Sequence, residues 1–150
     1  MINIVPTEKE HGSYILETLR PEDRKEIESA GNTPERAIFL TLKCAIYSKT
    51  ALVYDKPAAI WGIAGNVLSD TGVPFLLTGT EVYKVSPMAF SRIYLRELSE
   101  MKQYFPRLEN YVDSTYTGAV KMLKIAGFSL DEPFKAGDGS YQKFHIERSV

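Results

Sequence analysis

Residues 110–128 constrain the fold more than any other part of the sequence. Tyr111 and Val112 favour an extended backbone, and the short polar side chains at 113–115 can cap the first turn of a helix. Gly127 suits the left-handed conformation that ends a helix. Between these signals lies one apolar helical face, formed by Ala119, Met122, Leu123 and Ala126. The segment therefore predicts a strand, a polar turn and a short helix.

The rest of the chain also reads as strands mixed with helices. Pro21 and Pro34 suit the first turn of helices, and Ser86-Pro87 predicts the start of a long amphipathic helix that Pro106 ends. The first half is expected to contain a strand at 2–5, helices that begin at 7 or 8, at 21 (to 30) and at 33, and strands at 51–54 and 58–63 around a turn at 55–57. A strand at 73–79, the long helix, the strand, turn and helix of residues 110–128, and a hairpin at 133–147 are expected to follow. The third helix is expected to bury Ile38, Leu42, Ala45 and Ile46.

Composition limits the possible functions. The chain has 150 residues, which predicts a single domain spanning 1–150, and its formal net charge of -1 argues against nucleic acid as a partner. A single cysteine, Cys44, excludes an internal disulfide, and two distant histidines, His11 and His145, predict no metal site. No apolar run is long enough for membrane insertion, and the first ten residues do not resemble a signal peptide.

A strand followed by a short helix that closes in Gly127-Phe128, with Ala119 on the helix, resembles the C-terminal motif of the GNAT superfamily. The resemblance implies an α/β (α+β) fold with a mixed central sheet flanked by helices. It also implies transfer of an acetyl group from acetyl-CoA to an amine. Tyr116 stands where the motif usually has Asn, and Leu123 stands where it usually has Tyr.

The family holds the pyrophosphate of CoA in a glycine-rich turn before the long helix. The corresponding stretch here, residues 82–89, is Val-Tyr-Lys-Val-Ser-Pro-Met-Ala and contains no glycine, while Pro87 removes an amide donor. The side chains of Lys84 and Ser86 can still meet a phosphate, although an ordinary helix cap explains Ser86-Pro87 as well. The resemblance places the CoA contacts at Lys84, Val85, Ser86 and Ala89.

Two residues are candidates for proton transfer. Glu81 follows the strand at 73–79 and is the best-placed carboxylate for a base, while Tyr116 is the phenol nearest the position of the family's acid. The ordinary alternatives are a solvated loop carboxylate and a half-buried packing tyrosine. The charged run at 22–26 is expected to form a solvated helix face.

A narrower resemblance rests on Leu108-Glu109-Asn110-Tyr111-Val112 before the helix, and on an extended end at 142–146. These features are similar to GNAT-like bacteriophage proteins related to the small internal virion proteins of short-tailed coliphages, which also tend to lack the glycine-rich turn. The resemblance implies a catalytically degenerate protein of the virion, of its assembly or of genome ejection. Its partner would be a virion or host protein, and its location the virion or the host cytoplasm.

Two other hypotheses stay open. The chain could be an active, acetyl-CoA-dependent N-acetyltransferase with an atypical phosphate loop, which modifies a host or phage amine. It could also be an unrelated α/β binding module. A sheet without the splayed fourth and fifth strands of the GNAT fold would favour the binding module.

Overall fold

The structure is a computed structural model that describes residues 1–66 and 68–148. Its elements, in chain order, are β1 (Ile2–Pro6), α1 (Lys9–Thr18), α2 (Pro21–Ser29), α3 (Pro34–Cys44), β2 (Ala45–Val53), β3 (Lys56–Ala64), β4 (Thr71–Thr78), the 3-10 helix η1 (Thr80–Lys84), α4 (Pro87–Met101), β5 (Arg107–Asp113), α5 (Thr117–Ile125), β6 (Ser129–Leu130), β7 (Phe134–Ala136) and β8 (Gly139–Glu147).

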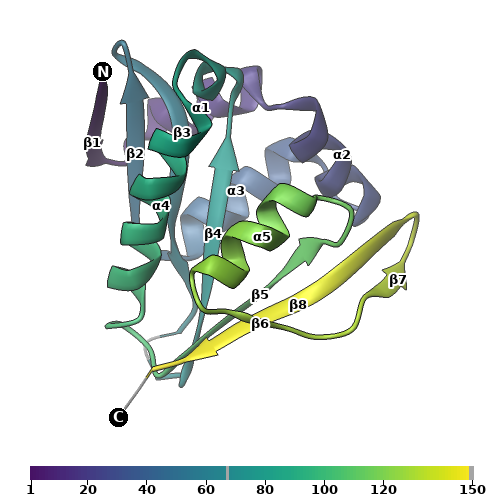
Figure 1. The fold of residues 1–150 in the computed structure, drawn as a ribbon. Helices are drawn as coiled ribbons and strands as arrows, with labels where there is room; N and C mark the ends of the chain where they lie inside the picture. Colours follow the sequence, from purple (N-terminus) through teal and green to yellow (C-terminus); the bar gives the residue numbers. More distant parts are fainter. Residues whose placement is uncertain (67, 149–150) are drawn as a thin grey trace.

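One sheet crosses the molecule in the order β1-β2-β3-β4-β5-β8-β6, and β7 pairs with the end of β8 (Figure 1). The β4–β5 pair is parallel, whereas the other paired strands are antiparallel. Helices α4 and α5 cover one face of the sheet, and α1, α2 and α3 cover the other (Figure 1). The sequence prediction of an α/β class with a mixed central sheet flanked by helices is confirmed.

The buried strand β3 contributes side chains to the cores on both faces of the sheet, because successive side chains of a strand point in opposite directions. Trp61 and Ile63 face a core formed with α4 and α5, and both side chains have no exposed area. Ile60 faces a second core formed with Ile15 of α1 and Ile38 of α3. The sheet is therefore packed on both sides, and Trp61 is the buried anchor of one core.

Helix α4 begins at the residues that the sequence signals predict. The Ser86 hydroxyl accepts a hydrogen bond from the amide of Ala89, and Pro87 occupies the first helical position. Tyr94, Leu98 and Met101 recur at helical spacing and are buried against the sheet. The predicted long amphipathic helix is thus confirmed.

Helix α5 ends as the sequence predicts. Gly127 has φ +95°, and the amides of Gly127 and Phe128 donate to the carbonyls of Lys124 and Leu123 at 3.0 Å each. This is the Schellman arrangement, in which a left-handed residue turns the chain back over the last helical turn. The Phe128 side chain is thereby placed in the core, against Phe144.

Several predicted boundaries were wrong. Helix α3 ends at Cys44, and Ala45 and Ile46 belong to β2, because Ala45 pairs with Ala64 of β3. The hairpin turn is formed by Tyr54 and Asp55, both with positive φ, rather than by residues 55–57. The two-residue strand β6 was not predicted, because its pairing with β8 is set by the tertiary fold rather than by a local pattern.

Within residues 1–66 and 68–148, no helix is long and apolar enough to cross a membrane. The same residues contain no group of three or more His, Cys, Asp or Glu side chains placed to hold a metal ion.

Candidate active site

Strands β4 and β5 separate soon after they pair. Their parallel register consists of Thr71 opposite Arg107 and Gly72 opposite Leu108, and it would bring Pro74 opposite Asn110 if it continued. Pro74 has no amide hydrogen to continue the ladder. Instead, the side-chain amide of Asn110 donates to the Pro74 carbonyl at 2.8 Å. The two strands therefore form a split that widens toward their carboxyl ends.

A pocket of about 210 Å³ occupies this split. We call it the split pocket. Pro74 and Leu76 of β4 line one side and Val112 of β5 lines the other. Helix α5, which lies in front of these strands in Figure 1, also lines the pocket. Most of its lining is apolar, contributed by Pro74, Phe75, Leu76, Val112, Ala119, Met122, Leu123 and Phe144.

The backbone of β4 offers polar groups inside this apolar slot. The carbonyls of Pro74 and Thr78 face the split, since they accept hydrogen bonds from the Asn110 side chain and from the Arg20 amide. Backbone groups of a strand repeat their direction every second residue, so the N–H and C=O of Leu76 also face the split. A thin extended ligand with amide groups can therefore pair with β4 at Leu76.

The first turn of α2 closes the wide end of the split. The Thr78 hydroxyl donates to Asp23 at 2.6 Å, and the Arg20 guanidinium is paired with the same carboxylate at 2.7 Å. From the other side, the Tyr116 hydroxyl donates to the backbone carbonyl of Glu22. These contacts fix α2 to the ends of β4 and α5, and thereby set the position of the next turn of α2.

That next turn carries Glu26, which lines the split pocket. The pKa of Glu26 is raised to about 7, mainly by burial and also by the negative charges of Asp23 and Asp113, while the positive charge of Arg20 opposes the rise. A carboxyl group that titrates near neutral pH is suited to accept and release protons.

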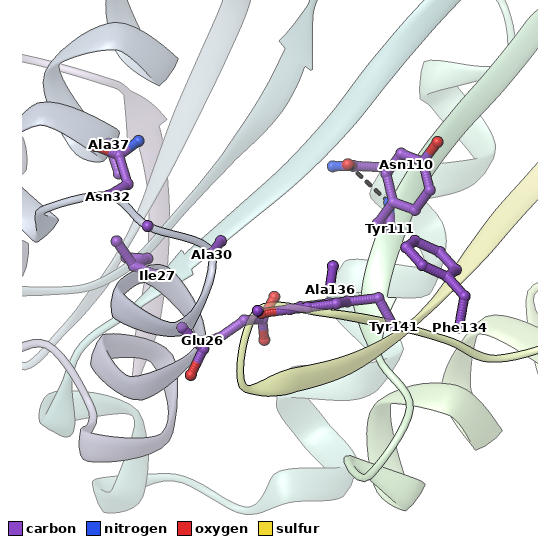
Figure 2. A pocket seen from close by; sticks show the side chains of 13 residues that line it. Glu26, Ile27, Ala30, Asn32, Ala37, Asn110, Tyr111, Phe134, Ala136 and Tyr141 are labelled. Atoms are coloured by element: carbon purple, nitrogen blue, oxygen red, sulfur yellow. Dashed lines mark hydrogen bonds between the residues drawn. The ribbon is translucent and has the colours of Figure 1, made fainter.

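Glu26 also lines a second, larger pocket of about 720 Å³ on the side of the sheet that α2 and α3 cover (Figure 2). We call it the outer pocket. Asn110 and Tyr111 of β5 line both pockets as well. The two pockets therefore adjoin at the split, and Glu26 lies at their junction.

The sequence-predicted proton-transfer residues lie in different places. Tyr116 lines the split pocket. Burial raises the pKa of its phenol, and nearby carboxylates raise it as well, Glu26 having the largest effect among them. Glu81 lies in η1 and lines neither of the two pockets as the structure describes them. Its carboxylate is paired with Lys84 at 2.9 Å, and the hydrogen bond from Lys84 lowers its pKa, which makes it a weaker base.

The predicted phosphate-binding residues are engaged with one another. Lys84 forms an ion pair with Glu81. The Ser86 hydroxyl accepts a hydrogen bond from the amide of Ala89, and the Ser86 carbonyl accepts one from the amide of Phe90. Val85 is half-buried between η1 and α4, and its amide donates to Val82. The start of α4 is therefore a capped helix end rather than an open row of amides.

Sequence reasoning missed Glu26, because the run at 22–26 was interpreted as a solvated face. In the structure Glu22, Asp23 and Glu26 are half-buried, whereas Arg24 and Lys25 are exposed. A signal was present: Asp23, Glu26 and Ile27 share one helical face at spacings of three and four. What the sequence lacked was any indication that this face meets the split.

A scan of the sequence against protein-family models finds no match, and neither does a search of curated proteins. The fold, in contrast, matches solved structures. An acetyltransferase of the GNAT family from Streptococcus pneumoniae aligns with a TM-score of 0.71 and 16% identity, over 99% of this chain and 100% of the other. The chain has the GNAT acetyltransferase fold.

Two further structures support this assignment of the fold. The GNAT domain of PAT from S. lividans aligns with a TM-score of 0.71 and 10% identity, over 98% of this chain and 90% of that one. Spermidine N-acetyltransferase from Vibrio cholerae, solved in complex with CoA and spermine, aligns with a TM-score of 0.68 and 11% identity, over 97% and 95% of the two chains. These likenesses extend over nearly the whole chain.

Proposed function

We propose that the chain is an N-acetyltransferase that uses acetyl-CoA and acetylates an amine. The observation that carries the proposal is the split between β4 and β5, where two pockets meet at a carboxyl group with a pKa of about 7. One pocket is a narrow apolar slot along a free strand edge, and the other is wide. This arrangement suits a thin thioester arm that meets an amine at the junction.

The acetyl-CoA molecule fits the site in part. Its pantetheine arm is thin, extended and carries amide groups, which matches the split pocket and the backbone of Leu76. Its pyrophosphate does not match the start of α4, where the amides of Ala89 and Phe90 are already taken. We therefore assign binding to the arm, and no phosphate contact to the capped helix end.

The residues at the junction can move the two protons of the reaction. When the amine nitrogen attacks the thioester carbonyl carbon, a C–N bond forms, the C–S bond breaks, the amine loses a proton and the thiolate gains one. In the proposal, Glu26 takes the proton from the amine, in place of Glu81. Tyr116, which stays protonated at neutral pH, exchanges its bond to Glu22 for one to the departing thiolate. The Leu76 amide faces the split and can stabilise the developing oxyanion.

A second candidate function is favoured by the capped start of α4. A protein of the virion or of phage assembly could keep the fold as a scaffold, lose acetyl transfer and act through a virion or host protein. The reported structural matches are acetyltransferases, and the junction at Glu26 is open, so we prefer the enzyme. The two candidates differ in whether acetyl-CoA binds.

Isothermal titration of the purified chain with acetyl-CoA and with CoA tests the proposal first. We expect micromolar binding, about -8 kcal/mol. Ala119→Phe, which fills the split pocket, should abolish the heat, whereas Gly118→Ala, on the open surface of α5, should not. Absence of binding at millimolar ligand by a folded chain would reject the enzyme and favour the virion-type candidate.

A further inference from the structure

The residues that line the outer pocket indicate which kind of amine it could bind. Among residues 1–66 and 68–148, thirteen line it, and Glu26 is the one charged residue of these thirteen. Ile27, Ala30 and Ala37 form an apolar wall on the side of α2 and α3. A ligand with a single positive charge is matched by this pocket, and the rest of the ligand meets mainly apolar surface.

Three aromatic side chains form the opposite wall, from β5, β7 and β8 (Figure 2). The rings of Tyr111 and Phe134 meet edge to face with centroids 5.8 Å apart, and those of Phe134 and Tyr141 lie 6.3 Å apart. Tyr111 and Phe134 are 52% and 44% exposed, so a large part of each residue is accessible to a ligand. Aromatic walls of this kind hold aromatic rings and cations well.

Tyr141 supplies a second, independent observation. Its side chain is 8% exposed, and its buried hydroxyl has no hydrogen-bond partner within the part of the chain that the structure describes. Burial raises the pKa of this phenol, and the charge of Glu26 raises it further, which places the two groups near each other. In Figure 2 the Tyr141 ring extends from β8 toward Glu26 of α2. Buried hydroxyls are rarely left without a partner, so this one points to a polar atom of a ligand.

We propose that the outer pocket binds a primary monoamine with an apolar body of about the size of a phenylethyl group. Its nitrogen lies between the Glu26 carboxylate and the Tyr141 hydroxyl, and its body lies between the aromatic wall and the apolar wall. Acetylation of the bound amine rests on the proposed function, whereas the binding itself does not.

The same pocket disfavours a polyamine. A second ammonium group would need a second carboxylate, and none lines the outer pocket within residues 1–66 and 68–148. The neighbouring depression contains Asp113 and Asp138, but Lys25 and Lys135 lie there as well and balance their charge. The expected specificity therefore differs from that of the spermidine acetyltransferase that shares the fold.

The test is titration of the chain with 2-phenylethylamine and with spermidine at pH 8, without acetyl-CoA. Binding is measured by isothermal titration calorimetry and by the shifts of amide NMR signals. We expect 2-phenylethylamine to bind at least about tenfold more tightly than spermidine. Glu26→Gln and Phe134→Ala should each weaken it by about tenfold or more. Phe39→Ala removes an aromatic ring that is 63% exposed and does not line the pocket, and it should change nothing.

The outcomes separate the two proposals. Equal or tighter binding of spermidine, or unchanged amine affinity in a folded Glu26→Gln chain, would overturn the monoamine site. Tyr141→Phe keeps the ring and removes the hydroxyl, so unchanged affinity there would remove Tyr141 from the site. If amine binding follows the expected pattern but acetyl-CoA does not bind, the pocket stands and the acetyltransferase proposal fails.

Discussion

The side-chain amide of Asn110 bonds to the carbonyl of Pro74 at 2.8 Å, at the point where β4 and β5 part. Pro74 has no N–H to donate to β5, so its carbonyl, which accepts from the Asn110 side chain, is the group through which β4 is bonded to β5 here. The bond holds the two strands at a fixed separation, and both pockets include Asn110 in their walls.

Asn110→Ala should lower the free energy of unfolding by about 1–2 kcal/mol, because the Pro74 carbonyl loses its partner. Urea denaturation measures the change. Asn3→Ala, at an exposed position of the edge strand β1, is the matched control and should shift stability by less than about 0.5 kcal/mol. Equal effects of the two substitutions would mean that the bond does not hold the split.

Acetyl transfer should depend on pH through Glu26. With a pKa of about 7, the carboxyl is protonated below neutrality and cannot accept a proton, so kcat/KM should rise through pH 7 and level off above it. Burial is the main cause of this pKa; the charges of Asp23 and Asp113 raise it, the charge of Arg20 lowers it, and the phenols of Tyr116 and Tyr141 lie nearby.

A pH profile of wild type and Glu26→Gln checks this dependence. The variant should lose about 10²-fold or more in kcat/KM together with the rise near pH 7. Glu81→Gln is the control, since that carboxylate lies outside both pockets, and it should keep the profile. A rise near pH 7 that persists in Glu26→Gln would assign it to another group.

The same carboxyl should reduce stability as the pH rises. A pKa that is higher in the folded chain than in the unfolded chain means that the folded state favours the proton, so the stabilisation is full below about pH 4.5 and is lost through about pH 7. Glu26→Gln should therefore be more stable than wild type at pH 8, by roughly 1–2 kcal/mol after allowance for solvent screening.

Thermal unfolding at several pH values measures this difference. The gain should shrink toward zero near pH 4, where wild-type Glu26 is protonated as well. A gain of the same size at pH 4 and pH 8 would show that packing, rather than charge, causes it.

Donor recognition should depend little on the phosphates of CoA. The amides of Ala89 and Phe90 are occupied, so acetyl-CoA and a short acetyl-pantetheine thioester should bind within about tenfold of each other. Competitive titration measures the ratio. A preference for acetyl-CoA above about 100-fold would show that a phosphate site exists elsewhere on the chain.

The ion pair beneath α4 should matter for stability rather than for activity. Glu97 is 4% exposed and is paired with Lys49 at 3.1 Å. Lys49→Met leaves that carboxylate buried without its partner and should cost about 3 kcal/mol of unfolding free energy. The double substitution Lys49→Met with Glu97→Leu should recover most of the loss in urea denaturation. If the double variant is no more stable than Lys49→Met, the cost lies in packing.

Local signals in the sequence predicted the helices and most of the strands. Ser86-Pro87, Pro106 and Gly127 fix φ angles or supply caps, and these preferences act within a few residues. The end of α3 was predicted wrongly, because Ala45 and Ile46 continue the helical pattern while the pairing of β2 with β3 overrides it.

The candidate site was harder to predict, because its residues come from distant elements. Tyr116 was found through its place at the start of α5. Glu26 and Tyr141 acquire their surroundings only when the fold brings α2 and β8 to the same pocket beside β5, and the raised pKa of Glu26 depends on that burial. Glu81 drew attention by its position after a strand, but its neighbour Lys84 neutralises it.

The insertion of β8 beside β5 also has a consequence for biosynthesis. The ribosome synthesises α2 early and β8 late, and the outer pocket is lined by residues of both elements. While the nascent chain is still growing, β1 to β4 can assemble with their helices, but Glu26 has no Tyr141 opposite it. The chain is thus expected to form the proposed amine pocket only once β8 has been translated, and a chain stalled before β8 would occupy a ribosome without a complete pocket.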